Sequence, residues 1–204
     1  MNRENYDLKM QKIIDALQKD GQRPKLLLHS CCAPCSSACL ERVKDFFDLS
    51  VYYYNPNIDS QEEFNLRAKE QERFCREQKV ACLIEDYKKE EFLRVVNGLE
   101  KEKEGGARCI ECFYLRLRKT AEKAKLLGFE YFATTLTVSP LKNAELLNKI
   151  GEKVQEQTGV KFLPTDFKKR GGYLRSIELS KKYNLYRQNY CGCEFSKREE
   201  KAIK

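Results

Sequence analysis

The sequence has one histidine, no long apolar run and no glycine-rich nucleotide-binding fingerprint. A single histidine excludes a metal site built from several imidazoles. No segment approaches the roughly 18 apolar residues that a membrane-spanning helix requires. The first residues, MNRENYDLKM, contain no apolar core of a secretory signal, so we expect a cytoplasmic protein with no membrane association. Without a G-x-G-x-x-G pattern, binding of NAD or flavin has no support.

Cysteine, by contrast, is abundant, because the 204 residues include ten cysteines. A small secreted domain would use them in disulfides. The cytosol is reducing, and there clustered cysteines serve as metal ligands or redox-active thiols. Since imidazole is scarce, the expected ligands are thiolates, and sulfur-rich ligation selects zinc or iron–sulfur clusters.

Most of the cysteines fall into three short clusters, with the close spacing of ligands that clasp one metal or one iron–sulfur cluster. The first cluster lies between a predicted strand and the start of a predicted helix, where backbone amides favour the thiolate. Four thiolates complete a structural zinc site, so the larger number indicates more than structural zinc. The candidate metal ligands are Cys31, Cys32, Cys35, Cys109, Cys112, Cys191 and Cys193.

The pair Cys191 and Cys193 allows two interpretations. A disulfide across Gly192 closes a small, strained ring that is easily reduced, so the pair could store two electrons as a dithiol. The same thiolates could instead ligate a metal, and the sequence leaves both possibilities open. The remaining cysteines, Cys39, Cys75 and Cys82, are isolated, and we expect them to pack in the core.

Hydrophobic periodicity predicts strands that alternate with helices. This order indicates an α/β fold with a parallel sheet flanked by helices, Rossmann-like and open doubly wound. From Tyr173 onward we expect a helical C-terminal extension that carries cysteines, with breaks near Cys191. Predicted strands cover residues 25–30, 49–54, 81–85, 130–136 and 160–163, and predicted helices cover 3–19, 34–47, 60–79, 90–99, 110–127 and 141–157.

No internal repeat or linker divides the chain, so we expect one domain spanning residues 1–204. It would comprise an N-terminal helix (1–24), an α/β core (25–165) and a basic helical tail (166–204). Open α/β sheets bind ligands beyond the carboxyl ends of their strands. Three segments should therefore gather at one rim of the sheet: 29–35, 55–58 and 135–140.

The formal net charge is +8, and the excess is concentrated near the C-terminus. A basic face of this kind suits a polyanionic partner such as RNA, although solubilising charge has the same composition. The only acids between residues 168 and 198 are Glu178 and Glu194. The basic residues there are Lys168, Lys169, Arg170, Arg175, Lys181, Lys182, Arg187, Lys197 and Arg198.

Several motifs follow one another along the chain: HSCCAPC (29–35), NPNI (55–58), RCIECF (108–113), TTLTVSP (134–140) and YCGCEFS (190–196). Together with residues 166–188, they resemble the epoxyqueuosine reductases of the QueH family, and the match covers about residues 25–196. The resemblance implies reduction of epoxyqueuosine to queuosine in the wobble position of certain tRNAs, the last step of queuosine biosynthesis. It also implies a 4Fe–4S cluster, a further iron beside it, and an electron donor that the sequence does not identify.

The resemblance assigns roles as expectations. The spacing of the pairs points to Cys31, Cys32, Cys109 and Cys112 as cluster ligands. Epoxide reduction needs two electrons and two protons, whereas a 4Fe–4S cluster delivers one electron at a time. Cys191 and Cys193 are then expected to act in electron transfer or to bind the second metal, and Asp166, in the matching tail, is a candidate acid catalyst. Residues 1–204 would form a single iron–sulfur reductase domain.

Two positions bear on this assignment. The turn Asn57–Ser60 has Asp59-Ser60 where the family pattern has His-Pro. In the family, the position of Cys35 alternates between cysteine and aspartate, which fits a ligand of a second metal better than a cluster ligand.

Three other classes of protein remain as alternatives. A tRNA-thiolating enzyme of the ATP-dependent α/β type would need a Ser-Gly-Gly phosphate loop after the first strand, and Ser30–Ala33 reads Ser-Cys-Cys-Ala instead. Another iron–sulfur enzyme of tRNA modification, or a non-catalytic RNA-binding zinc protein, would share the cysteine clusters and the basic tail.

Overall fold

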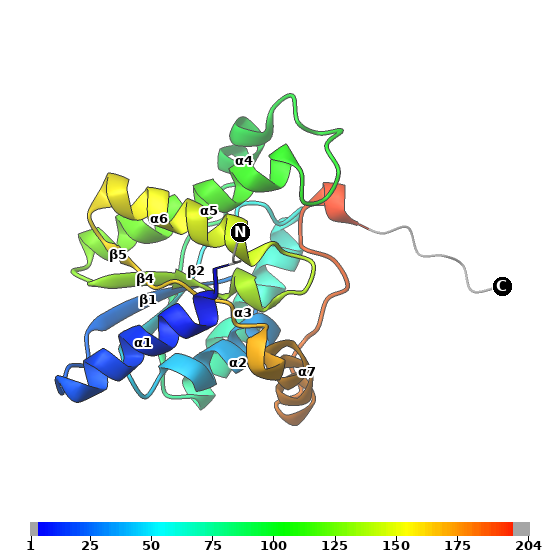
Figure 1. The fold of residues 1–204 in the computed structure, drawn as a ribbon. Coiled ribbons are helices and arrows are strands. Elements are labelled where there is room, and N and C mark those ends of the chain that lie inside the picture. Colours follow the sequence, from blue (N-terminus) through cyan, green and yellow to red (C-terminus); the bar gives the residue numbers. More distant parts are fainter. Residues whose placement is uncertain (1–3, 198–204) are drawn as a thin grey trace.

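A five-stranded, all-parallel sheet forms the centre of the protein, with the strand order β3-β2-β1-β4-β5 (Figure 1). The structure, a computed structural model, describes residues 4–197. The strand order reverses between β1 and β4, so the carboxyl ends of these two strands flank an open crevice. The strands are β1 (Lys25–Ser30), β2 (Asp48–Tyr53), β3 (Ala81–Ile84), β4 (Tyr131–Thr134) and β5 (Lys161–Phe162).

Helices cover both faces of this sheet, which confirms the predicted doubly wound α/β fold (Figure 1). One face carries α1 (Tyr6–Lys19), α2 (Ala33–Val43), α3 (Gln61–Glu77) and α7 (Gly172–Lys182). The other face carries α4 (Lys89–Val96), α5 (Ala107–Leu126) and α6 (Ala144–Thr158). Short 3-10 helices occur at η1 (Thr135–Val138), η2 (Lys169–Gly171) and η3 (Glu194–Ser196).

The central strand β1 shows why this sheet forms. Leu26, Leu27 and Leu28 are all fully buried, as expected for a parallel strand that is covered on both faces. Successive side chains point to opposite faces. Leu26 and Leu28 accordingly pack in the core beneath α1 and α2, whereas Leu27 packs in the core beneath α5 and α6.

Most of the predicted elements form near their expected ends. Ser60 caps α3 as predicted, because its hydroxyl accepts a hydrogen bond from the Glu63 amide at 3.2 Å. The strand predicted for residues 130–136 ends earlier, at Thr134, whose hydroxyl accepts from the Leu136 amide and turns the chain into η1. The helix predicted for 34–47 ends at Val43.

The tail is helical only in part. Helix α7 ends at Lys182, and the chain then runs without helix to Cys193 before η3. Leu185 packs into the core beside α2 and α3, so this irregular stretch is fastened to the body of the domain. Arg198, the last of the basic residues noted above, lies outside the described residues.

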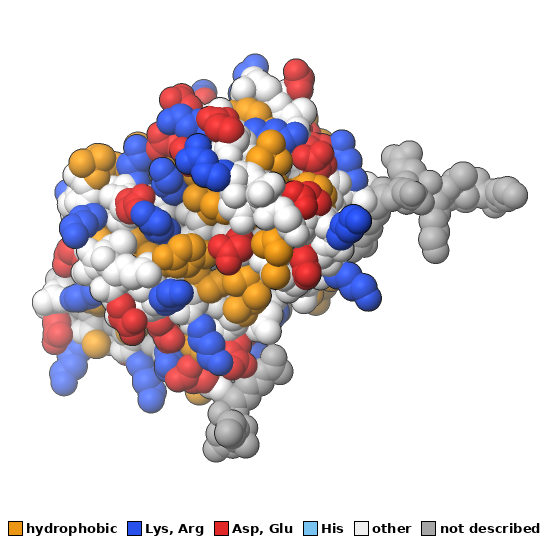
Figure 2. Space-filling view, turned by 90° about the horizontal axis from the view of Figure 1, so that it is seen from above, with side chains coloured by type: hydrophobic (Ala, Val, Ile, Leu, Met, Phe, Trp, Pro, Cys, Tyr) orange, Lys and Arg blue, Asp and Glu red, His pale blue; other side chains and the backbone are white. Residues whose placement is uncertain are grey.

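The surface above α4, α5 and α6 carries both signs of charge (Figure 2). Lysine and arginine side chains alternate there with aspartate and glutamate, with apolar patches between them. This face therefore carries no continuous patch of positive charge. Among the described residues, no helix combines the length and the apolar character that crossing a membrane would require.

Gly172, the first residue of α7, allows a test of how this helix is positioned. A Cβ at Gly172 would lie 1.8 Å from the Phe167 carbonyl oxygen, so Gly172→Ala should force the backbone to move. We expect a loss of about 1–3 kcal/mol in the free energy of unfolding, measured by chemical denaturation under reducing conditions. Gly171→Asn is the matched control, because that site is open and asparagine tolerates its positive φ of 73°. Equal stability of the two variants would contradict the packing argument.

Candidate functional site

The first cysteine cluster lies where β1 passes into α2, at the carboxyl edge of the sheet. Cys32 is the N-cap of α2, Pro34 lies in its first turn, and Cys35 follows. The Sγ atoms of Cys31, Cys32 and Cys35 all lie within 4.8 Å of one another, and those of Cys31 and Cys32 are 3.9 Å apart. Within residues 4–197, no other three cysteine, histidine or carboxylate side chains bring their ligand atoms this close together.

A buried glutamine supports this cluster from below. The Gln71 side chain accepts a hydrogen bond from Ser30 Oγ at 2.7 Å and donates one to Ser36 Oγ at 3.0 Å. Ser30 Oγ also lies 3.1 Å from the carbonyl oxygen of Cys32. Gln71 is fully buried, so these bonds are shielded from water and fix the loop that carries the thiols.

The second cluster occupies the first turns of α5. Cys109 Sγ accepts a hydrogen bond from the Gly105 amide at 3.2 Å, and Cys112 is buried. Arg108 precedes both cysteines. Its guanidinium donates to the carbonyl oxygen of Glu100 at 2.8 Å and lies over the Phe195 ring, 4.7 Å from the ring centroid. Arg108 thus ties the loop before α5 to the end of the tail.

The third cluster belongs to the tail, which crosses the carboxyl edge of the sheet. Cys191 faces the pocket, whereas Cys193 is buried, packs with Cys112, Phe92 and Val96, and donates to Ser196 Oγ at 3.3 Å. Between them Gly192 has a φ of 121°, a conformation that side chains with a Cβ rarely adopt.

Asp59, in the turn before α3, holds this tail in place. Its amide donates to the Gly192 carbonyl at 2.9 Å. Its carboxylate accepts from the Tyr190 hydroxyl at 2.9 Å and pairs with Lys197 at 2.5 Å. The aspartate therefore holds the segment on both sides of Cys191 and Cys193.

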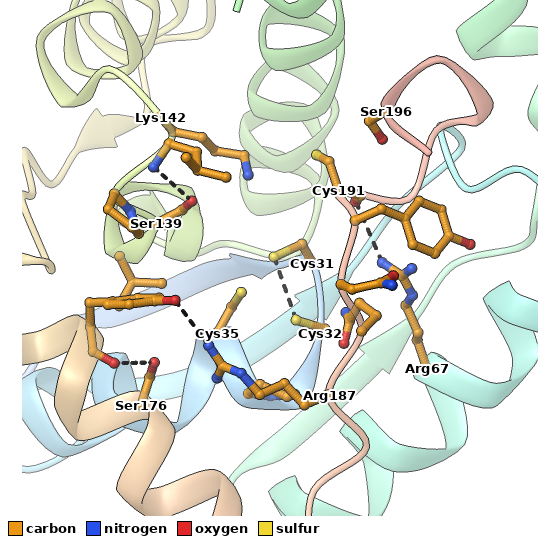
Figure 3. Close-up of a pocket in the computed structure, with 18 of the residues that line it drawn as sticks. Cys31, Cys32, Cys35, Arg67, Ser139, Lys142, Ser176, Arg187, Cys191 and Ser196 are labelled. Atoms are coloured by element: carbon orange, nitrogen blue, oxygen red, sulfur yellow. Dashed lines mark hydrogen bonds between the residues drawn. The ribbon is translucent and has the colours of Figure 1, made fainter. Parts of the chain in front are cut away.

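A cavity of about 610 Å³ opens above the first cluster (Figure 3). Cys31, Cys32, Cys35 and Cys191 line it, so the structure brings these four predicted site residues to one cavity, whereas Cys109, Cys112 and Cys193 do not line it. Other parts of the wall come from the loop after η1, from α7 and from the tail; they include Ser139, Lys142, Tyr173, Ser176, Arg187 and Tyr190.

The thiols of the first cluster differ in acidity. Hydrogen bonds from Cys32 and Cys35 lower the pKa of Cys31 well below its ordinary value, and the charges of Arg116 and Lys142 act in the same direction. The same bond with Cys31 raises the pKa of Cys32 to about 12, and the two neighbours raise the pKa of Cys35. Cys31 is therefore the first of these thiols to ionise and to offer a thiolate to a metal.

Arg116 stands between the clusters and is only 1% exposed. Its guanidinium donates to Asn55 Oδ1 at 2.6 Å, to His29 Nε2 at 3.3 Å and to Cys112 Sγ at 4.0 Å. His29 Nε2 also lies 3.1 Å from the Tyr54 carbonyl oxygen, and Nδ1 lies 3.0 Å from Thr134 Oγ1, so both ring nitrogens have polar partners. His29 is thus a buried, hydrogen-bonded core residue.

Two further cations face the cavity. Arg67, 2% exposed, pairs with Glu63 at 2.6 Å and donates to the Cys191 carbonyl at 3.4 Å, while its Nη2 is buried without a hydrogen-bond partner. The Lys142 side chain extends towards Cys191 and Cys31 (Figure 3). Burial acts to lower the pKa of this lysine, but the nearby sulfurs of Cys191, Cys31 and Cys35 together outweigh burial and raise its pKa above the ordinary value.

Asp166 lies away from the cavity wall. Its side chain is mostly buried, and its Oδ1 is 3.4 Å from Lys168 Nζ. Lys168 Nζ in turn donates to the carbonyl oxygen of Lys142 at 3.1 Å. The connection of Asp166 to the cavity therefore runs through two lysines.

The remaining cysteines are core residues, and the basic tail is only partly neutralised by ion pairs. Cys39 and Cys75 are fully buried in the core and Cys82 packs against it, as predicted. In the tail, Arg170 pairs with Asp7 and Arg175 pairs with Glu41 and Glu178, whereas Lys169 and Arg187 are exposed and have no carboxylate partner among residues 4–197.

The sequence reasoning missed the buried cations and Gln71. Arg116 follows Cys112 by one helical turn, a spacing that could have indicated contact with the sulfur. Arg67 and Gln71 occur in a polar helix, but they share one face with Phe64, Ala68, Phe74 and Cys75, a spacing that could have indicated burial. Lys142 follows the TTLTVSP motif but lies outside it.

The model of the family described as "Epoxyqueuosine reductase QueH" matches residues 26–199. The chain belongs to the QueH family. A QueH protein from Staphylococcus epidermidis, named epoxyqueuosine reductase, is 45% identical over 200 residues, which cover 94% of this chain and 84% of the relative. One from Streptococcus pyogenes is 46% identical, covering 94% and 78%. One from Thermotoga maritima is 36% identical, covering 84% and 89%. The family is named for an oxidoreductase activity.

A solved structure shares the fold of this QueH chain. It is the U34-tRNA thiolase NcsA from Methanococcus maripaludis with its [4Fe-4S] cluster. The TM-score is 0.56 at 15% sequence identity, and the match covers 93% of this chain and 67% of the thiolase chain. At this identity, the likeness concerns the α/β architecture.

His29 provides a pH-dependent test of the site. Burial, and secondly the charge of Arg116, lower the pKa of His29 from 6.5 to about 3. Below pH 6.5 the unfolded chain binds a proton that the folded chain rejects, so stability should fall between pH 6.5 and 3 by up to about 1.4 kcal/mol per pH unit. Because the chain has one histidine, its ring signal in NMR spectra of tag-free, metal-free protein is unambiguous. We expect no titration of that signal from pH 5 to 8, and a midpoint near 6.5 would contradict the buried Arg116–His29 contact.

Proposed function

We propose that this chain reduces epoxyqueuosine to queuosine in the wobble position of tRNA, the last step of queuosine biosynthesis. The main support for this proposal is the cysteine-lined cavity at the carboxyl edge of β1 and β4, in a chain whose relatives are named for this activity. The cavity of about 610 Å³ has the size expected for a nucleoside-sized ligand. A base in tRNA would enter it after leaving its stack.

The residues fit an anionic, thiolate-ligated metal centre. Three sulfurs gather within 4.8 Å, and the buried Arg116 supplies positive charge beside Cys112. We propose that Cys31, Cys32, Cys109 and Cys112 hold a 4Fe–4S cluster. The sulfur of Cys35 lies within 4.8 Å of those of Cys31 and Cys32, and Cys35 also lines the cavity, so we propose that it binds a second iron beside the cluster, with Cys191 or Cys193 as a further ligand.

The reaction converts an epoxide to an alkene, takes up two electrons and two protons, and releases one water. The iron–sulfur centre would supply electrons one at a time from an external donor that remains to be identified. Cys191 and Cys193 would provide the second store of electrons as a dithiol, or would ligate the second iron. Lys142 extends into the cavity, where its ammonium would stabilise negative charge on the departing oxygen. Asp166 remains a candidate proton donor, linked to the cavity through Lys168 and Lys142.

The basic tail is proposed to contact tRNA. Phosphates bind exposed cations that have no competing carboxylate. Lys169 and Arg187 meet this condition, and Arg187 also lines the cavity. We propose that the protein acts in the cytoplasm, where its tRNA substrate occurs.

The double variant Cys191→Ser, Cys193→Ser tests the division of roles among the cysteines. Anaerobically purified wild-type protein should be brown and hold about four iron and four sulfide, with one more iron if the second metal is present. The double variant should keep the cluster absorbance but fail to convert epoxyqueuosine in tRNA, because four other cysteines satisfy the cluster. Iron and sulfide analysis together with nucleoside analysis of the tRNA measures both.

Cys39→Ser is the matched control, since this thiol lies in the core and outside the cavity, and it should retain the cluster and the activity. Loss of the cluster from the double variant would place the pair among the cluster ligands. Retained activity would remove the pair from the mechanism. Colourless wild-type protein with stoichiometric zinc would favour the RNA-binding zinc protein instead.

The variant Lys169→Gln, Arg187→Gln tests the tRNA contact. Each lost phosphate contact should flatten the dependence of log K on log salt by roughly 0.7–0.9. We expect weaker tRNA binding at low salt and a slope reduced by about that amount per contact, measured by fluorescence anisotropy over a salt series. The control is Lys12→Gln, Lys19→Gln on α1, which removes the same charge from exposed positions away from the cavity. If both variants weaken binding equally, the tail has no specific role.

A further inference from the structure

The most deeply buried charge beside the cysteines is Arg116. Its side chain leaves α5 and crosses to the end of β1, where all three of its partners are neutral or sulfur atoms: Asn55, His29 and Cys112. Among residues 4–197 no carboxylate pairs with it. A buried cation that lacks a counter-ion carries a large desolvation cost. Such a residue is retained when a negative group beside it offsets that cost.

The other cations near the cysteines are compensated differently. Arg67 is equally buried, but the Glu63 carboxylate 2.6 Å away neutralises it. Arg108 donates to the carbonyl oxygens of Leu99, Glu100 and Glu102. Lys142 is half-buried in the cavity wall, and within residues 4–197 its ammonium makes no hydrogen bond to a cysteine sulfur. Arg116 alone of these four combines full burial, no carboxylate and a hydrogen bond to a cysteine sulfur among the described residues.

We propose that Arg116 is a positioning residue that sets the reduction potential of the iron–sulfur centre, through its buried positive charge and its hydrogen bond to Cys112 Sγ. This inference rests on the cofactor in the proposed function. Hydrogen bonds to ligand sulfurs and the net charge of the surroundings are established determinants of cluster potentials. On reduction the centre takes one electron from a one-electron donor, such as a reduced viologen, and becomes more negative by one charge. Arg116 stabilises that product more than the oxidised form, so it raises the potential.

Two variants separate charge from packing. Arg116→Met removes the charge and the donors while keeping an unbranched side chain. Asn55→Asp leaves Arg116 in place but puts a carboxylate where the Asn55 oxygen lies, 2.6 Å from the guanidinium. It therefore neutralises the cation without emptying the site. Arg118→Met is the matched control, because it makes the same change of charge on the same helix at an exposed position paired with Glu122.

The experiment is an anaerobic redox titration of each purified, cluster-containing protein, followed by the EPR signal of the reduced cluster, with iron and sulfide quantified in every sample. We expect Arg116→Met and Asn55→Asp to lower the midpoint potential. The ratio of reduced to oxidised cluster at a fixed potential should fall by about tenfold, which is 59 mV for a one-electron couple. Arg118→Met should shift the midpoint potential far less.

The inference is overturned if the midpoint potentials of Asn55→Asp and Arg116→Met both equal the midpoint potential of Arg118→Met. If Arg116→Met fails to fold or to hold iron, Asn55→Asp decides, because it keeps the guanidinium in place. Wild-type protein without iron and sulfide would refute the proposed cofactor itself and this inference with it. An unshifted potential in an intact cluster would refute only the role of Arg116.

Discussion

The contact of Arg116 with the end of the sheet is the interaction on which the rest of the site depends. One guanidinium joins α5 to β1 through His29 and to the loop after β2 through Asn55. The same group reaches Cys112. Because these residues are buried, displacing any partner would leave the charge of Arg116 without one of its hydrogen bonds in a medium of low dielectric constant. The helix that carries the second cysteine cluster is thereby held against the strand that leads into the first.

The sheet order explains why these groups meet at all. In the order β3-β2-β1-β4-β5, the chain leaves β1 and β4 on opposite sides of the sheet, into α2 and α6. The backbone at that point opens a crevice between the two strand ends. The first cysteine cluster follows β1 directly, and the loop with Ser139 and Lys142 follows β4 and η1. The cavity is thus a product of topology, and its chemistry comes from the residues at two strand ends.

The tail completes the cavity from the far end of the sequence. Arg67 and Asp59, both near the start of α3, hold the backbone around Cys191 and Gly192. The Asp59 carboxylate also pairs with Lys197 beyond Cys193. A carboxylate that binds both Tyr190 and Lys197 holds the segment by two kinds of bond, of which the exposed ion pair is the weaker.

Much of this protein followed from local pattern alone. The alternation of strands and helices predicted the doubly wound sheet, the capping residue Ser60 marked the start of α3, and the clustered cysteines together with the motifs at strand ends indicated the family and the place of the site. Local patterns could not reveal which distant partners the inward-facing polar side chains meet. Arg67, Gln71 and Arg116 belong to helices whose sequences allow exposure, and Lys142 belongs to a loop. Only the packing of helices on the sheet placed these cations beside the thiols, because the partners that compensate a buried charge are distant in sequence and are brought close by tertiary structure.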